Sequence, residues 1–211
     1  MRTDDLINLL TQDPSPPWRF RRVLAWAVAE GIAIAAILFF GWIGFRPDIS
    51  KAVMGGGFWL KVVATIALAV TATRAALSLG RPGGNLPHRG LMLAIAPALL
   101  VCAVVVELLV LPEAQWMPRL VGHNAAKCLT LIPLFSIGPL ACLLVALRQG
   151  APSSPGLAGA VAGMAASGIA ATFYAANCGD DSPLFVMTWF SIATLIVTTV
   201  GYLIGRKLLR W

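Results

Sequence analysis

The sequence is poor in charged side chains and nearly devoid of histidine. Of its 211 residues, 12% are Asp, Glu, Lys or Arg, and the histidines are His88 and His123. Soluble domains are about a quarter charged, so a soluble globular class is excluded. The two histidines fall on opposite sides of the topology predicted below, and neither GxSxG nor HExxH occurs. The sequence therefore predicts that the protein is not an enzyme.

Other absences narrow the membrane classes. No long stretch alternates between polar and apolar residues, which excludes a membrane β-barrel. No ladder of polar residues runs through the middle of the apolar segments, which argues against ion or proton conduction. A small permease or metal exporter, which is the alternative function for this chain, would need a continuous polar path of this kind. A third class, a thiol oxidoreductase that passes electrons to quinone, generally needs more than one pair of cysteines on the oxidising side of the membrane. The sequence offers one such pair, which is described below.

Long apolar runs dominate what is present. Hydrophobic residues make up 58% of the chain, and about 20 consecutive apolar residues span a bilayer. Six runs qualify: Val23–Phe45, Phe58–Leu79, Gly90–Leu111, Ala125–Leu147, Gly156–Ala176 and Pro183–Gly205. The first begins only after Arg22 and lacks a small-residue cleavage pattern, so we expect it to remain as an anchor. The predicted fold is all-α, a bundle of six transmembrane helices.

Basic residues predict the orientation of this bundle. With the N-terminus inside, eleven basic residues lie on the cytoplasmic side and five on the outer side. Cytoplasmic loops carry the excess of Lys and Arg, so both termini are predicted to be cytoplasmic. The net charge of +7 then reflects this bias towards anionic lipid headgroups, and direct nucleic-acid binding is not expected.

The first residues predict a short amphipathic helix on a tether. Thr3 can cap a helix whose first turn holds Asp4 and Asp5. One face carries Leu6, Ile7, Leu9 and Leu10. Acidic residues disfavour an anionic lipid surface, so docking into a groove of a cytoplasmic protein is favoured over lying on the membrane. We predict a docking helix and proline-rich tether over residues 1–17, and a sensor domain of six membrane helices over residues 18–211.

Two later segments have unusual helix composition. Small residues recur every four positions in the fifth run, at Gly159, Gly163, Ser167 and Ala171. This spacing predicts a helix buried in the bundle against a close neighbour. Pro133 and Pro139 are expected to kink the fourth helix.

Two cysteines are predicted to lie at one level near the outer face. Cys128 falls in the first turn of the fourth helix, and Cys178 falls just past the fifth. The pair is consistent with a static disulfide, a reversible thiol switch, or two soft ligands for a transient thiophilic metal ion. His123, Asp180 and Asp181 are near enough in sequence to assist a metal, although no recognised zinc spacing is present. No other cofactor is expected.

Four charged residues fall within the apolar runs. By depth, Glu30 is predicted to pair with Arg74 near the cytoplasmic face, and Lys61 with Glu107 near the outer face. Intramembrane charges often mark functional sites, but two matched pairs also fit a structural role.

Four stretches of the chain carry a resemblance: the TDDLI start, AAKCLTLIPLFSIGPLACLLVALRQGAP, PGLAGAVAG and YAANCGDDSPLFVMTWF. They resemble the NrsF family of bacterial inner-membrane anti-sigma factors. The resemblance covers the full length and is most specific in the C-terminal half. It implies a multi-pass protein that holds an extracytoplasmic-function sigma factor at the membrane and releases it under heavy-metal or oxidative stress.

The resemblance also suggests roles for particular residues. Cys128 and Cys178 fall on the family cysteines linked to the stress response, and the TDDLI segment falls on the part that engages the sigma factor. Cys102 and Cys142 match no family cysteine and are interpreted as apolar fillers of their helices. The resulting hypothesis is that a change at the cysteine pair shifts the fourth and fifth helices and frees the sigma factor.

Overall fold

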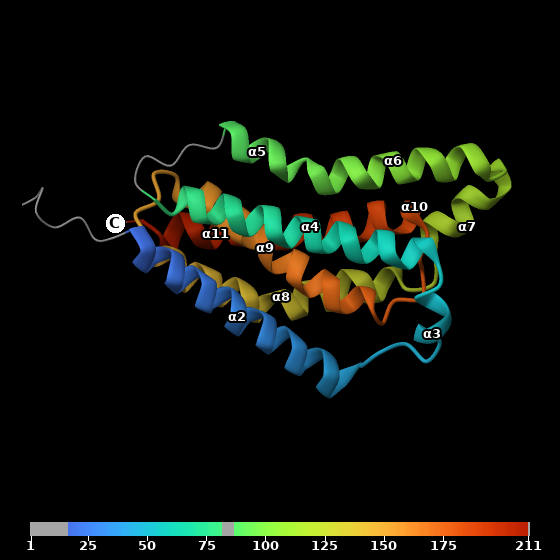
Figure 1. Cartoon of the computed structure of the whole chain (residues 1–211), viewed down its shortest axis with the longest axis horizontal. Helices are drawn as coiled ribbons and strands as arrows, with labels where there is room; N and C mark the ends of the chain where they lie inside the picture. Colours follow the sequence, from blue (N-terminus) through green and yellow to red (C-terminus); the bar gives the residue numbers. More distant parts are fainter. Residues whose placement is uncertain (1–16, 82–86, 211) are drawn as a thin grey trace, which may run out of the picture.

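The computed structural model describes residues 17–81 and 87–210 and is helical throughout its long elements. Six segments of it are long and apolar enough to cross a membrane, which agrees with the predicted all-α fold. They are α2 (Pro17–Trp42), α4 (Gly56–Leu79), α5 with α6 (Pro87–Leu93, Ile95–Val110), α8 (Ala125–Arg148), α9 (Pro155–Ala175) and α10 with α11 (Pro183–Phe185, Ser191–Leu208). Figure 1 shows the start of α2 and the end of α11 at the same end of the bundle.

Two ends of the bundle are distinguished below. The terminus end is the one where α2 begins and α11 finishes. The cysteine end is the opposite one, where α2 finishes, α8 begins and Cys178 follows α9. It also carries the short helices α3 (Ile49–Ala52) and α7 (Trp116–Val121), together with a 3-10 turn over Glu113–Gln115.

Three predicted helices differ from the structure in their boundaries. The first begins earlier, at Pro17, because proline is favourable at the start of a helix. The third breaks at Ala94 between α5 and α6, where the ring of Pro97 would clash with the carbonyl of Leu93 in a continuous helix. The sixth contains a π-helical turn, Val186–Phe190, that periodicity does not reveal.

Helix α9 is the buried centre of the bundle, as its small residues predicted. It packs against α4, α8 and α11. Gly159 and Gly163 face α11 so closely that a methyl group on Gly159 would meet the backbone of Gly201 and lie 2.8 Å from the Cα of Gly205. On the α4 side, a methyl group on Gly168 would lie 2.6 Å from the backbone nitrogen of Ala69. Small residues therefore set the helix spacing here.

Helices α2 and α8 also meet through a glycine. A Cβ on Gly31 would lie 2.9 Å from the Cα of Pro139. The α8 helix runs from Ala125 to Arg148 with both Pro133 and Pro139 inside it. The intrahelical proline at this contact removes a backbone donor but leaves a flat surface for α2.

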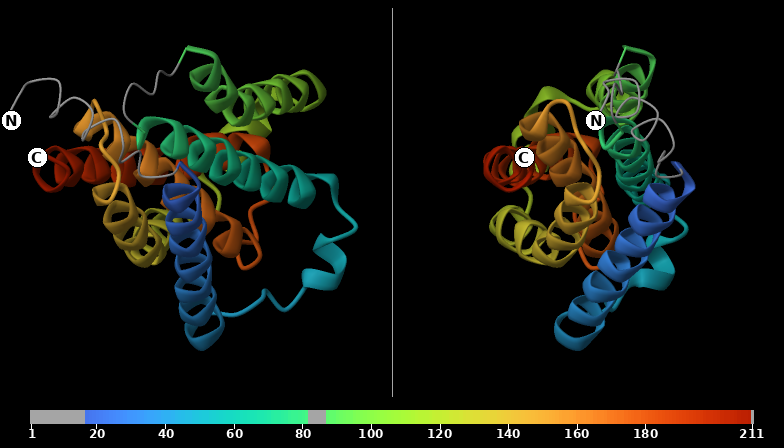
Figure 2. Two further views of the ribbon diagram at one scale, coloured as in Figure 1. Left: turned by 60° about the vertical axis from the view of Figure 1, so that its left-hand side comes forward. Right: turned by 90° about the vertical axis from the view of Figure 1, so that its left-hand side faces the viewer.

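Helix α6 is the peripheral member. It stands at the edge of the bundle beyond α4 (Figure 2). In the most apolar part of the segment Gly90–Val110, which contains α6, 11% of the residues are buried inside the protein, against 67% in the corresponding part of α9. Most of its apolar surface therefore faces outwards, as expected of a helix solvated by lipid.

Candidate functional site

The predicted docking residues lie outside the described part of the chain. They are Thr3, Asp4, Asp5, Leu6, Ile7, Leu9 and Leu10. What the structure places is the helix that follows them, because α2 begins at Pro17 at the terminus end. Any segment before Pro17 is thus connected directly to α2.

Cys128 and Cys178 share one buried cluster at the cysteine end. Their exposed fractions are 0% and 1%, and both thiols are free. Cys128 lies in the first turn of α8, and Cys178 follows α9. Tyr174, also fully buried, belongs to the same cluster, and its hydroxyl has no hydrogen-bond partner among the described residues. The site therefore holds two thiols and one unpaired hydroxyl away from solvent.

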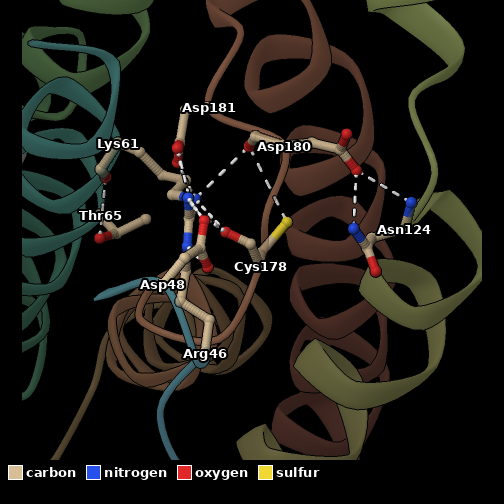
Figure 3. Close-up of polar contacts among 8 residues, drawn as sticks. All are labelled: Arg46, Asp48, Lys61, Thr65, Asn124, Cys178, Asp180 and Asp181. Carbon is tan, nitrogen blue, oxygen red and sulfur yellow. Dashed lines mark hydrogen bonds and ion pairs between the residues drawn. The ribbon is translucent and has the colours of Figure 1, made fainter. Parts of the chain in front are cut away.

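The segment after α9, residues 177–182, forms a hub of polar contacts. The carbonyl oxygen of Cys178 accepts hydrogen bonds from Lys61 Nζ at 2.8 Å and from Arg46 Nη1 at 3.1 Å. The carboxylate of Asp181 pairs with the same two cations, at 2.7 Å from Lys61 and 2.9 Å from Arg46. Figure 3 shows these groups converging beside the Cys178 sulfur. The backbone of Cys178 is therefore held by two cations.

Asp180 connects the hub to α8. Its Oδ2 accepts hydrogen bonds from the backbone N–H groups of His123 and Asn124 and from the Asn124 side chain, at 2.9 to 3.1 Å. Asn124 is the residue that precedes α8. A carboxylate at this position accepts hydrogen bonds from the free amide donors and is stabilised by the positive end of the helix dipole. Asp180 therefore fixes the start of the helix that carries Cys128.

The end of α2 is tied to the hub as well. The backbone N–H of Arg46 bonds to the Ala176 carbonyl at 3.3 Å, and Asn177 Nδ2 bonds to the Gly44 carbonyl at 3.0 Å. Arg46 also holds Asp48 through two hydrogen bonds of 2.8 and 2.9 Å. Asp48, followed by Asp181, raises the pKa of the Arg46 guanidinium above its usual value, while burial opposes this. Arg46 is therefore a permanently charged link between α2 and Cys178.

Neither predicted intramembrane ion pair is found among the described residues. Lys61 pairs with Asp181 instead, and Glu107 accepts hydrogen bonds from Arg119 at 3.2 Å and from Ser182 at 2.8 Å. Helix depth put Lys61 and Glu107 at the correct end, but a loop that folds over the helix ends supplies closer partners. Glu30 and Arg74 are both exposed on the outer faces of their helices.

The predicted metal ligands do not form a cluster. In the described part of the chain, no group of three or more His, Cys, Asp and Glu side chains can hold a metal ion. The side chain of His123 is 96% exposed and its Nδ1 lies 3.8 Å from Asp180. Asp180 and Asp181 already serve the start of α8 and the two hub cations. Any thiophilic ion at this end would thus depend on Cys128 and Cys178 themselves.

The pKa of the Cys178 thiol lies below its ordinary value. A hydrogen bond with Cys128 is the main cause, the positive charge of Lys61 adds to it, and burial opposes both. Cys178 Sγ also lies 3.9 Å from the carbonyl of Asp180. Thiolate is the nucleophilic form of cysteine, so Cys178 is the more reactive member that this environment prepares.

The roles of Arg46 and Lys61 were missed at the sequence level. The charge bias predicts that both bases lie on the outer side, where the two acids of AANCGDDSP, Asp180 and Asp181, are also expected. Two acids and two bases predicted at the same end of the bundle are the sequence signal that locates the hub. Interpreting the acids as metal ligands does not use this signal.

Comparisons with known proteins agree on one family. Residues 10–211 match the family described as negative regulator of sigma F. The chain is 34% identical over 218 residues to the anti-sigma-F factor NrsF of Caulobacter vibrioides (strain NA1000 / CB15N) and 31% identical over 220 residues to the probable anti-sigma-F factor NrsF of Azospira oryzae (strain ATCC BAA-33 / DSM 13638 / PS). Each comparison covers 100% of both chains. No solved structure matches.

These relatives are regulators, which agrees with the prediction that the protein is not an enzyme. The length of the match and the level of identity leave one assignment: the chain belongs to the NrsF family of negative regulators of sigma F.

Proposed function

We propose that the protein is an anti-sigma factor of the bacterial inner membrane, with both termini in the cytoplasm. It would hold an extracytoplasmic-function sigma factor of the sigma F kind and release it when Cys128 and Cys178 react under heavy-metal or oxidative stress. The observation that carries the proposal is the full-length similarity to two anti-sigma-F factors. The cysteine pair and its hub supply a chemical basis for the release step.

Capture is assigned to the segment before α2. A helix of two to three turns is marginal alone in water, so residues 3–12 would become ordered when Leu6, Ile7, Leu9 and Leu10 are covered by a partner. The prolines that follow keep this segment separate from α2. This arrangement suits a sigma factor that arrives from the cytoplasm.

Release is assigned to the cysteine pair. With hydrogen peroxide as the oxidant, the two thiols lose two protons and two electrons as their sulfurs form an S–S bond, and the O–O bond breaks to give two waters. A soft heavy-metal ion would act on the same pair by replacing both thiol protons. Burial of both sulfurs restricts the reaction to small reagents.

Transmission runs from Cys178 to α2 through the hub. Drawing Cys178 towards Cys128 would displace its carbonyl from Arg46 and Lys61. Arg46 lies four residues after the end of α2 at Trp42, and the other end of α2 leads to the docking segment. One helix therefore connects the reacting residue to the capture segment, and the hub is the element with two arrangements that such coupling requires.

Capture can be tested by co-purification from detergent-solubilised membranes. Full-length protein with Leu6, Ile7, Leu9 and Leu10 changed to Ser is expected to lose its sigma factor. The matched control changes Asn8 and Gln12, on the polar face of the same helix, to Ser and should retain it. Undiminished capture by the first variant contradicts the docking role.

Release can be tested with a sigma-dependent reporter. Cys128→Ser with Cys178→Ser should preserve capture and abolish induction, while Cys102→Ser with Cys142→Ser should respond normally. An unchanged response in the first variant excludes the pair as the sensor. Arg46→Ala should give reporter activity without an inducer, whereas Asp48→Asn, which alters an exposed partner of Arg46, should not. Normal induction in Arg46→Ala would rule out transmission through the hub.

A further inference from the structure

Two cavities lie along α4 and α6, one at the cysteine end and one towards the middle of the bundle. The wider cavity has a volume of about 1090 Å³ and lies between α4, α6, α7 and the hub, with Leu60, Leu99 and Val106 on its apolar walls. A second cavity of about 290 Å³ follows along the same two helices past Leu68 and Leu93. We call the two together the α4–α6 groove.

The groove has the length and surface of a lipid site. Glu107 at its mouth and Ala96 near its far end are eleven residues apart in α6, which is about 16.5 Å of helix. Half of a bilayer's hydrocarbon core is about 15 Å thick, so the groove is long enough for an acyl chain and a headgroup. Its position beside the most peripheral helix opens it to the surrounding lipid. Contact of these apolar walls with water would be unfavourable.

Charged groups surround only the mouth. Arg119 is 45% exposed, and within the described residues its guanidinium makes one hydrogen bond, from Nη1 to Glu107 at 3.2 Å. The remaining N–H groups of a guanidinium form a fork that suits phosphate oxygens. A phosphate group of a lipid is thus the natural partner for this side of the mouth.

The other side of the mouth is acidic. Asp180 and Asp181 line it together with Glu107. Asp181 is 27% exposed, and each carboxylate oxygen retains lone pairs beyond its own ion pair. These carboxylates favour an ammonium group that donates hydrogen bonds and disfavour a headgroup with net negative charge. A choline headgroup carries positive charge but no N–H donor.

We propose that the α4–α6 groove binds one phospholipid with a phosphoethanolamine headgroup. Arg119 holds its phosphate, the carboxylates of the hub receive its ammonium, and one acyl chain lies along Leu60, Leu99 and Leu68. Lipid binding at this site requires neither the sigma factor nor a reaction of Cys128 and Cys178.

Native mass spectrometry of the full-length protein tests this proposal. Protein released from nanodiscs of phosphatidylethanolamine, phosphatidylcholine or phosphatidylglycerol with identical acyl chains should retain the first about tenfold more than the others, the value of one charge-assisted hydrogen bond. Arg119→Ala should lower the retention of all three lipids, because each of them carries the phosphate that Arg119 holds.

Val106→Trp provides a steric test that leaves the headgroup contacts in place. It should displace the lipid, whereas Val105→Trp, at the adjacent exposed position outside the groove, should not. Equal retention of the three lipids, preference for phosphatidylglycerol, or identical behaviour of the two tryptophan variants would overturn the proposal.

Discussion

The two ends of the bundle are held together by different kinds of interaction. All four ion pairs of Lys or Arg found in the described residues lie at the cysteine end, and three of them involve Arg46 or Lys61. The terminus end is dominated by close apolar packing, in which glycines of α9 and α11 touch. One end therefore depends on a few directional bonds to residues 177–182, and the other on many small dispersion contacts.

This difference separates a region suited to switching from one suited to anchoring. Directional polar networks have discrete satisfied and broken states, so a small displacement of Cys178 has a large effect. Packed small residues tolerate no insertion but contain no chemically reactive group. We therefore expect that substitutions which change a single charged atom lower the stability most at the cysteine end, and that substitutions which add volume lower it most along α9 and α11.

Removing the charge of Asp181 should have the largest effect. Asp181→Asn leaves Lys61, which is fully buried, and Arg46 without their shared carboxylate. Loss of one partner of a buried ion pair costs about 3 kcal/mol. Unfolding in detergent micelles should show this loss, and Asp48→Asn, the same chemical change at a 55% exposed partner of Arg46, should stay near the native value. Similar stabilities for the two variants would remove the distinction between hub and rim.

Added volume along α9 should come next. Gly159→Ala places a methyl group against the backbone of Gly201 and Gly205. Overpacking of this kind costs about 2 kcal/mol, and backbone neighbours cannot move aside as a side chain can. Gly41→Ala in α2 meets nothing within 4 Å and should be neutral or slightly stabilising. Equal stability of both variants would show that the α9–α11 contact is looser than described.

The reactivity of Cys178 should depend on its neighbour. Because its folded-state pKa lies below the ordinary value, its thiolate persists to lower pH than that of an ordinary cysteine. In a background with Cys102 and Cys142 changed to Ala, Cys128→Ala should move the midpoint of the alkylation rate to higher pH. Cys128→Ser keeps a hydrogen-bond donor and should move it less. The same midpoint pH in both variants and in the background protein would exclude Cys128 as the cause of the lowered pKa of Cys178.

The smallest expected effect concerns a single neutral hydrogen bond. Trp189 Nε1, in the π-helical turn, donates to the carbonyl of Leu120 at 2.7 Å. Trp189→Phe should cost about 1 kcal/mol in the same unfolding measurement. A cost as large as that of Asp181→Asn would mean that α7 contributes more to the cysteine end than the hub does.

The six long apolar helices could be predicted from sequence because bilayer thickness requires a long apolar run of each spanning helix. The buried position of α9 could also be predicted, since its small residues recur at helical spacing. The break at Ala94 follows from the local clash of the Pro97 ring with the carbonyl of Leu93, which hydrophobic periodicity does not reveal, and the π-helical turn is likewise not encoded in the periodicity.

The polar contacts at the site were harder to predict. Depth along the helices placed Cys128 and Cys178 at one level, because rise per residue is fixed. The same reasoning paired Lys61 with Glu107 incorrectly, since it does not describe how residues 177–182 fold back over four helix ends. Asp180 and Asp181 were considered as metal ligands, but their amide and cation partners come from segments far away in sequence.

The amount of sigma factor that co-purifies with the full-length protein, before and after the Cys128–Cys178 disulfide is formed, tests the central claim most directly. Capture in the reduced state and its loss in the oxidised state, with Cys128→Ser and Cys178→Ser retaining the partner throughout, is the predicted result. Equal capture in both redox states, with the disulfide verified by mass spectrometry, would contradict the account.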